Sequence, residues 1–303
     1  MKYQTKSIYK PILTLIDLIG NLIYFNRNKV LPKNSKKVLF FSLGHIGDLI
    51  LATPTFQTFK QNNPTCNVDV LCRSVSSSLL ECNPFVNNTF TFDAPWLSCT
   101  YKSKGNAQKE IVKLLKAQKY DIVFEMHGHP KSLYLAHQLN SFVIGYGCRG
   151  GGFYCNKMKN FDSNMKTLNQ NLYLIGDYWT RMYNQPQIFT PSYNLQLPSS
   201  FIIINPKSGK KEKDLTKDEV EKIINDNSSE TILITGLDKD NRFDKFPNVQ
   251  NWTGKTSLQE LIDIVRKAKM VYAPDTGIVH IAYAVGTPVK AVYKTTNPKI
   301  WGY

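Results

Sequence analysis

Two stretches of this chain place glycine and an acidic residue directly after an apolar run. In the first, the apolar run 38–41 leads through Gly44 and Gly47 to Asp48. The pattern predicts a buried strand, a tight turn and the first turn of a helix. Glycine lets backbone N–H groups approach a ligand closely, and a carboxylate at a strand end can serve as a general base. Asp48 is therefore a candidate base; the simpler interpretation is a helix cap, since acids are favoured in a first helical turn.

The second stretch lies near the C-terminus and follows the same logic. The short strand expected at 270–273 is followed by Asp275, Thr276, Gly277 and His280. Thr276 is a favourable N-cap, and the unsatisfied N–H groups of a first turn form an anion site together with the helix dipole. His280 could contact that anion or orient Asp275, although a histidine on a helix face is often a buried core residue.

Strands alternate with helices along most of the chain, which predicts parallel sheets with crossover helices. The alternation occurs twice, in 36–183 and in 201–303, and the proline-bearing stretch 184–200 is the expected linker. Expected strands after the first are 68–73, 89–92, 121–125, 142–147, 201–205, 231–235, 270–273 and 289–293, and expected helices are 106–118, 164–183, 217–225, 257–267 and 277–285. The predicted architecture is two similar α/β domains that face each other across a cleft.

Composition narrows the class of protein. The chain has 303 residues, 42% hydrophobic and 20% charged, which is typical of a folded globular protein. Its six cysteines form no C-x-x-C pair, so we expect free thiols in a reducing compartment and no zinc site. The net charge of +15 favours an anionic partner. Because aromatic and basic residues are not interleaved, we expect that partner to be lipid and not nucleic acid.

Much of this positive charge lies at the N-terminus, in the segment 1–35. Residues 1–37 hold eight Lys or Arg and one acid, Asp17. The apolar stretch 11–25, if helical, places Thr14, Asp17 and Asn21 on one narrow stripe. It is shorter than the roughly 20 residues needed to span a bilayer. We expect an interfacial helix on anionic lipid; the alternative is a helix that packs on the first domain without contacting lipid.

Several short motifs follow one another along the chain, between roughly residues 37 and 303. They are Gly-His-Ile-Gly-Asp at 44–48 with Thr53-Pro54, Asn-Pro-Phe-Val at 83–86, the strand end 121–132, Gly-Lys-Thr-Ser-Leu at 254–258, and Asp-Thr-Gly-x-x-His at 275–280 with Gly-Thr-Pro at 286–288. With these motifs the chain resembles glycosyltransferase family nine, the heptosyltransferases of lipopolysaccharide core synthesis.

The resemblance implies a GT-B fold, that is, two Rossmann-like domains facing a central cleft. It implies an inverting, metal-independent enzyme with no cofactor, a nucleotide-diphosphate-heptose donor that is commonly ADP-linked, and a lipopolysaccharide-core or related acceptor. It also implies a peripheral enzyme on the cytoplasmic face of the inner membrane. In this interpretation Asp48 is the base, and the donor is bound by Gly47, Asp275, Thr276, Gly277 and His280.

The chain departs from the family pattern in two places. A Lys-x-Trp-Pro element is replaced by Lys213-Asp214-Leu215-Thr216, and residues 297–303 stand where relatives continue into a closing helix. By its offset we expect Lys213 to stabilise the leaving diphosphate. Lys210 and Lys211 compete for that role, and the alternative for Lys213 is a solvated side chain.

A second group of candidates follows the expected strand 121–125. His127 and His129 form an H-x-H, but no third ligand lies at metal-ligand spacing, so we predict no metal site. We expect His127, with Lys131 and Arg149, to lie on the acceptor side, where the two cations could attract an acidic lipid acceptor. The alternative is that the histidines end a strand and the cations are solvated.

Two other functions remain open. One is an NAD-dependent Rossmann oxidoreductase, although the spacing of Gly44 and Gly47 departs from G-x-G-x-x-G and the second strand ends without the acid that would hold a ribose. The other is a catalytically inactive nucleotide-binding scaffold, which the two departures favour and the retained Asp48 and 275–277 disfavour.

Overall fold

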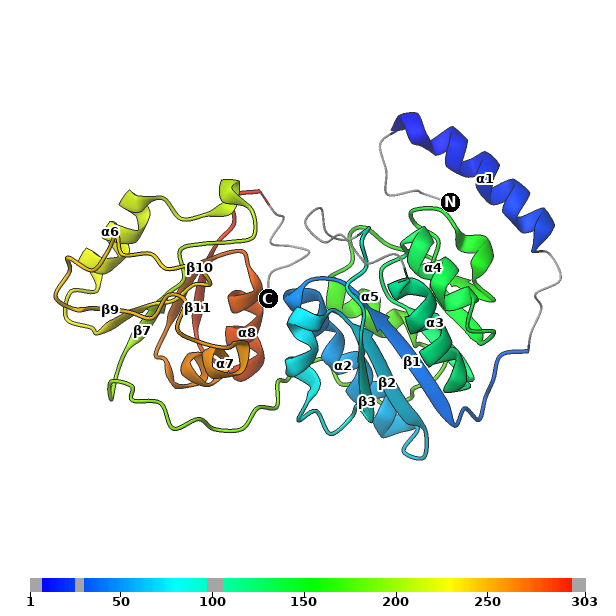
Figure 1. Ribbon diagram of the computed structural model, residues 1–303, viewed down its shortest axis with the longest axis horizontal. Coiled ribbons are helices and arrows are strands. Elements are labelled where there is room, and N and C mark those ends of the chain that lie inside the picture. Colours follow the sequence, from blue (N-terminus) through cyan, green and yellow to red (C-terminus); the bar gives the residue numbers. More distant parts are fainter. Residues whose placement is uncertain (1–6, 25–29, 97–105, 296–303) are drawn as a thin grey trace. The chain divides into compact units, whose positions relative to one another are not determined.

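The chain divides into two compact units, each with its own sheet (Figure 1). The computed structural model describes residues 7–24, 30–96 and 106–295. The first unit contains the residues up to Ser77 together with Pro84–Asn184, and the second contains Ser78–Asn83 together with the residues from Gln185 onward. The departure expected at 297–303 lies outside the described residues.

In the first unit the described strands form a parallel sheet in the order β3-β2-β1-β4-β5-β6. The strands are β1 (Lys37–Ser42), β2 (Asn67–Cys72), β3 (Asn88–Thr91), β4 (Ile122–Glu125), β5 (Phe142–Tyr146) and β6 (Lys157–Lys159). The helices are η1 (Ser7–Tyr9), α1 (Lys10–Ile23), α2 (Ile46–Asn62), η2 (Ser74–Leu80), α3 (Ala107–Ala117), α4 (Pro130–His137), η3 (Gly152–Tyr154) and α5 (Thr167–Leu174), where η marks a 3₁₀ turn. The chain order reverses between β1 and β4, and ligands of doubly wound folds bind beside such a reversal.

The second unit repeats this plan with the parallel order β11-β10-β7-β8-β9. Its strands are β7 (Ile202–Ile204), β8 (Ile232–Ile234), β9 (Val249–Asn251), β10 (Val271–Pro274) and β11 (Val289–Val292). Its helices are η4 (Lys211–Lys213), α6 (Lys217–Asp226), α7 (Leu258–Lys267) and α8 (Gly277–Val285). Here the reversal lies between β7 and β10. The two predicted parallel α/β units, the Rossmann-like halves of the GT-B class, are therefore confirmed.

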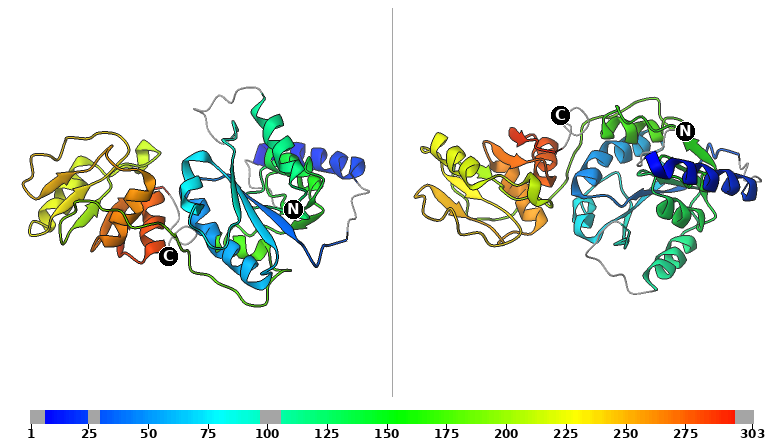
Figure 2. Two further views of the ribbon diagram at one scale, coloured as in Figure 1. Left: turned by 60° about the horizontal axis from the view of Figure 1, so that its bottom comes forward. Right: turned by 90° about the horizontal axis from the view of Figure 1, so that it is seen from above.

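Helices cover both faces of the first sheet, so that β1 is apolar along nearly its whole length (Figure 2). On one face Leu39 and Phe41 pack in a cluster with residues of α3 and α4. On the other face the Phe40 ring stacks on Phe124 at 4.7 Å and meets Phe56 of α2 edge-on. A strand buried on both faces reads as an unbroken apolar run, which is why β1 was recognisable in the sequence.

One expected element is wrong in extent, and two short strands were not predicted. The helix expected at 164–183 is only α5, and residues 175–184 are irregular. Side chains of α2 replace the helical hydrogen bonds there: Asn62 accepts the N–H groups of Thr180 and Arg181, and Asn63 donates to the Tyr178 carbonyl. The short strands β6 and β9 were not predicted, because three residues with half-exposed ends carry little apolar signal.

Helix α1 forms as expected but has an unusual orientation on the first unit. Its buried residues are Asp17 and Gly20, which belong to its polar side, whereas most of its apolar residues are exposed. Of the three residues of the predicted polar stripe, Asp17 is buried against the first unit, whereas Thr14 and Asn21 are exposed. Among the described residues, no helix is long and apolar enough to cross a membrane.

Candidate functional site

In the first unit the candidate side chains lie at the carboxyl ends of β1 and β4, the two strands on either side of the reversal. Phe41 of β1 pairs with Glu125 of β4 in the register, so the turns that follow these strands begin side by side. The first turn leads to Asp48 and the second to His127. The Gly44 backbone N–H donates to His127 Nε2 at 3.2 Å and joins the two turns.

Asp48 occupies the third position of α2 and caps the start of that helix. Its Oδ2 accepts the His45 backbone N–H at 2.7 Å. Gly44 makes this geometry possible, because a Cβ at residue 44 would lie 2.4 Å from Asp48 Oδ2. Gly47 is buried in the same first turn. The capping interpretation of Asp48 is thus correct, but it does not compete with catalysis: one oxygen is held, and a carboxylate carries acceptor sites on both oxygens.

Glu125 is a buried acid at this corner to which sequence reasoning assigned no role. It ends β4 with no exposed surface, and its Oε2 accepts the Gly128 N–H at 2.6 Å. Burial raises its pKa to about 7, although the backbone donors and the cation of Arg149 act in the opposite direction. Gly128 has a φ of +64°, and a Cβ there would lie 2.6 Å from the Tyr146 carbonyl oxygen. The signal in the sequence was a lone acid at the end of an apolar strand.

The two histidines of the H-x-H have separate partners. His127 is partly buried, and desolvation lowers its pKa. Its Nε2 atom accepts the Gly44 N–H and therefore carries no proton itself. His129 is the N-cap of α4, and its Nδ1 accepts the Lys131 N–H at 3.2 Å. Burial lowers the pKa of His129 to about 4. Within the described ranges no group of three metal-ligating side chains occurs.

Aromatic and cationic side chains surround His129. The Trp96 ring stacks on His129 with centroids 5.9 Å apart, and Lys131 Nζ lies 5.9 Å from the centroid of Trp96. Arg149 is exposed in the turn after β5, and its charge helps to lower the pKa values of His127 and His129. The structure therefore brings His127, Lys131 and Arg149 to the same edge of the sheet, and Trp96 joins them from a loop for which no role was predicted.

In the second unit the corresponding corner joins η4, after β7, to the start of α8, after β10. Lys213 Nζ lies 3.1 Å from Asp275 Oδ2 and 3.4 Å from the Asp275 carbonyl oxygen. Both side chains are largely buried, at 16% and 8% exposed. Of the three competing lysines, Lys213 is the one beside α8; Lys210 and Lys211 form no ion pair within the described residues.

Helix α8 begins as predicted, with Thr276 in the N-cap position and Gly277 as its first residue. Its N-terminus differs from the expectation in one respect: the Thr276 side chain makes no capping hydrogen bond within the described chain. The first-turn N–H groups are therefore not satisfied by a side-chain cap. His280 lies one turn further and is buried, at 6% exposed. The helix ends at Gly286, whose φ of +82° is the usual left-handed termination.

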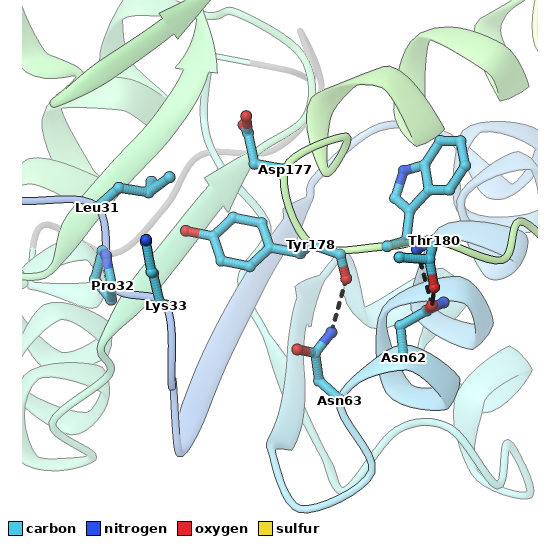
Figure 3. Close-up of a pocket in the computed structure, with 9 residues that line it drawn as sticks. Leu31, Pro32, Lys33, Asn62, Asn63, Asp177, Tyr178 and Thr180 are labelled. Carbon is cyan, nitrogen blue, oxygen red and sulfur yellow. Dashed lines mark hydrogen bonds between the residues drawn. The ribbon is translucent and has the colours of Figure 1, made fainter.

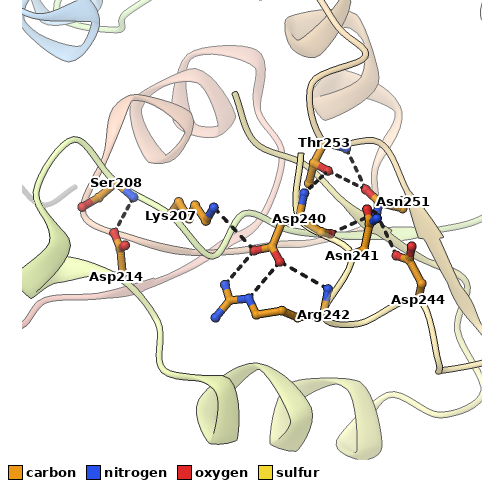
Figure 4. A network of polar contacts seen from close by, with 9 residues as sticks. All are labelled: Lys207, Ser208, Asp214, Asp240, Asn241, Arg242, Asp244, Asn251 and Thr253. Carbon is orange, nitrogen blue, oxygen red and sulfur yellow. Dashed lines mark hydrogen bonds and ion pairs between the residues drawn. The ribbon is translucent and has the colours of Figure 1, made fainter. Parts of the chain in front are cut away.

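A polar network at the same edge of the sheet supports the loop that carries Lys213 (Figure 4). Asp240 accepts two hydrogen bonds from the Arg242 guanidinium, at 2.8 and 2.6 Å, and forms an ion pair with Lys207 at 3.7 Å. The hydrogen bonds from Arg242 lower the pKa of Asp240. Within the loop, the Ser208 N–H donates to Asp214 at 2.7 Å. These pairs fix the backbone on either side of η4.

A pocket of about 480 Å³ lies in the first unit (Figure 3). It is lined by Lys33 before β1, by Asn62 and Asn63 at the end of α2, and by residues 177–180. Asp48 is at the other end of α2, and a 17-residue helix is about 25 Å long. The pocket is therefore separate from the corner that holds Asp48.

The sequence of the chain is similar to those of known glycosyltransferases. The sequence profile of glycosyltransferase family 9 (heptosyltransferase) matches residues 109–303. Lipopolysaccharide heptosyltransferase 3 of Escherichia coli is 22% identical over 294 residues, which cover 84% of this chain and 82% of that protein.

Solved structures show the same fold. A family 9 glycosyltransferase of Veillonella parvula superposes with a TM-score of 0.76 at 17% identity, over 90% of this chain and 84% of that one. The E. coli heptosyltransferase WaaC, in complex with ADP-2-deoxy-2-fluoro heptose, superposes with a TM-score of 0.72 at 18% identity, over 86% and 90% of the two chains. The chain is a glycosyltransferase and belongs to glycosyltransferase family 9, the heptosyltransferase family.

Proposed function

We propose that the protein transfers a heptose-type sugar from ADP-heptose to a lipopolysaccharide-core or related acceptor, with inversion and without a metal ion. The observation that carries the proposal is the position of Lys213 beside the N-terminus of α8. A lysine next to the positive end of a helix dipole is electrostatically unfavourable unless negative charge is present. Asp275 supplies one such charge, and a diphosphate would supply more.

The donor half of the reaction follows from this corner. When the bond between the anomeric carbon and the diphosphate breaks, negative charge grows on the leaving oxygen. The Lys213 ammonium and the N–H groups at Thr276 and Gly277 are preorganised donors for that charge, and such electrostatic stabilisation can replace a metal ion. We assign Gly47 and His280 to donor binding from the motif alone.

The acceptor half requires a base. A single displacement forms the bond from the acceptor oxygen to the anomeric carbon while the bond to the diphosphate breaks, and the hydroxyl proton passes to a carboxylate. Asp48 is the partly exposed acid at the first reversal point, held in place by the His45 N–H. Glu125 is fully buried and its Oε2 accepts the Gly128 N–H, so it is suited to holding the turn after β4, and its carboxyl group is not accessible to a substrate hydroxyl.

We assign the acceptor to an anionic, lipid-linked glycan. Lys131 and Arg149 place two exposed cations near His127 and His129, and Trp96 offers an aromatic face on which a sugar ring can pack. An acceptor of this kind places the enzyme at the cytoplasmic face of the inner membrane as a peripheral protein. The lipopolysaccharide assignment is supported by the E. coli relative, and the ADP-heptose assignment by the ligand in the WaaC complex.

The test is transfer from ADP-heptose in the presence of EDTA, with purified lipopolysaccharide core as acceptor. We expect release of ADP that depends on acceptor, and a product whose anomeric configuration, read by NMR, is opposite to that of the donor. Retained configuration would contradict the single displacement. Activity that disappears in EDTA and returns with a divalent cation would contradict metal independence.

A further inference from the structure

Helix α1 presents an apolar face to the outside of the first unit. Six apolar residues of this face have 47–72% of their surface exposed: Ile12, Leu15, Ile16, Ile19, Leu22 and Ile23. On a helical wheel these residues share one side, opposite Asp17. A helix on the surface of a globular protein ordinarily shows the reverse pattern, with its apolar side toward the core.

The inner side of α1 is held by specific contacts. Asp17 Oδ1 accepts the Gly151 N–H at 2.8 Å, in a buried position. Gly20 faces the Phe153 ring so closely that an added Cβ would lie 2.4 Å from it. At the end of the helix, the Tyr24 ring stacks on Phe153 with centroids 5.7 Å apart. The outward direction of the apolar face is therefore set by packing.

Charge identifies the occupant of this face. The segment 1–37 carries eight basic residues, of which Lys37 pairs with Asp69 at 3.4 Å, and its single acid, Asp17, is turned inward and buried. An apolar helix face in a basic segment with no outward acid is complementary to a surface of anionic lipid. The 14 residues of α1 extend about 21 Å, which is too short to cross a bilayer. The helix can therefore lie in the membrane interface but cannot span the bilayer.

We propose that α1 lies in the plane of an anionic bilayer with this apolar face inserted, and that Asp17 fixes the orientation of the catalytic unit toward that membrane. The Asp17–Gly151 hydrogen bond ties the helix to the turn after β5, which also carries Arg149. When α1 is docked on the membrane, Arg149, one of the cations on the acceptor side, is therefore held near the lipid-linked substrate. This second part rests on the proposed function; the docking itself rests on the apolar face of α1 and the charge of the segment 1–37.

The experiment is flotation of the full chain with vesicles of phosphatidylethanolamine and phosphatidylglycerol, and with phosphatidylcholine alone. Ile19→Asp is the test variant, and Leu114→Asp on α3 is its matched control, because the two side chains are 49% and 48% exposed. We expect the wild type and Leu114→Asp to float with anionic vesicles. The affinity of Ile19→Asp for these vesicles should be lower by a factor of about ten or more. Equal flotation of both variants, or no flotation of the wild type, would overturn the docking.

Three further readouts separate the possible failures. Light scattering tests whether a second copy of the chain covers the face. If the wild type does not float but forms a dimer, and Ile19→Asp is a monomer, the occupant of the face is a second copy of the chain and not lipid. An ADP-induced rise in melting temperature in Ile19→Asp shows that this variant is folded and binds donor, so loss of flotation is then a lipid effect. Asp17→Ala should float normally but transfer more slowly to vesicle-embedded acceptor; an unchanged rate would overturn its orienting role.

Discussion

The ammonium group of Lys213 lies 3.1 Å from the Asp275 carboxylate, although the two residues are 62 positions apart in the sequence. They come together because β7 and β10, which precede them, are neighbours at the reversal point of the second sheet. The first unit uses the same device: Asp48 and His127 follow β1 and β4, the neighbours at its own reversal point. Each unit thus gathers its candidate chemistry where two strands of a doubly wound sheet diverge.

Asp48→Asn separates the catalytic role of this residue from its capping role. Asparagine can still accept the His45 N–H, so we expect the melting temperature and ADP binding to change little. The transfer rate should fall by about 10²–10⁴-fold, the usual contribution of a positioned base. The measurement is turnover with saturating ADP-heptose.

A matched control exists at the start of α7. Glu260 occupies the same third helical position and accepts the Ser257 N–H at 2.8 Å. Glu260→Gln should leave the rate unchanged. Full turnover in Asp48→Asn would remove Asp48 from the mechanism.

Gly44→Ala tests whether the turn after β1 must bring its backbone close to Asp48. The new methyl group would collide with Asp48 Oδ2 at 2.4 Å and displace the carboxylate. We expect the free energy of unfolding to drop by about 1–3 kcal/mol, as for other overpacked sites, and transfer to be lost with it. Gly209→Ala is the control, since no atom lies within 4 Å of a Cβ there. A Gly44→Ala protein with normal stability and turnover would show that the turn tolerates a side chain.

Glu125 gives a stability profile with a defined direction. Its folded-state pKa is raised to about 7 from 4.5, so the native state binds the proton more tightly than the unfolded state. The stability from this group is fully present below about pH 4.5 and is lost as the pH rises to about 7, on the order of 3 kcal/mol in total. The lowered pKa values of His127 and His129 give the opposite slope, so the Glu125 contribution is read as a difference between variants. Over pH 4.5 to 8, the free energy of unfolding of the wild type minus that of Glu125→Gln should fall as the pH rises, whereas the same difference for Glu110→Gln, an exposed acid on α3, should stay flat. A flat difference for Glu125→Gln would mean that Glu125 titrates normally.

The parts of the fold that could be predicted from the sequence are those with strong local signals. Helix α8 matches its expected bounds, because Thr276 and Gly286 mark both ends with cap residues. The helix expected at 164–183 stops at Leu174, because Asn62 at the end of α2 and Asn63 directly after it bond to the backbone that follows. Such long-range side-chain contacts leave no trace in local periodicity.

The site shows the same division. The motifs placed Asp48, Lys213 and Asp275 in segments that follow strands, and in the structure these residues follow β1, β7 and β10. That Asp48 caps its own helix, that Lys213 contacts Asp275, and that Asp17 faces inward depend on which backbone groups lie nearby. Glu125 and Trp96 were given no role because their environments arise from burial and stacking across separate segments.

The most direct test of the account is a thermal-shift titration in EDTA with ADP, UDP, GDP, CMP and NAD, on the wild type, Lys213→Ala and Lys210→Ala. Ligand binding to the native state raises stability by RT ln(1 + [L]/Kd). We predict selective stabilisation by ADP in the wild type and in Lys210→Ala. Lys213→Ala should bind ADP about 10–100-fold more weakly, the usual effect of losing a charged hydrogen bond. Selective stabilisation by NAD, silence from all five nucleotides, or equal ADP affinity in Lys213→Ala would contradict the proposed donor site.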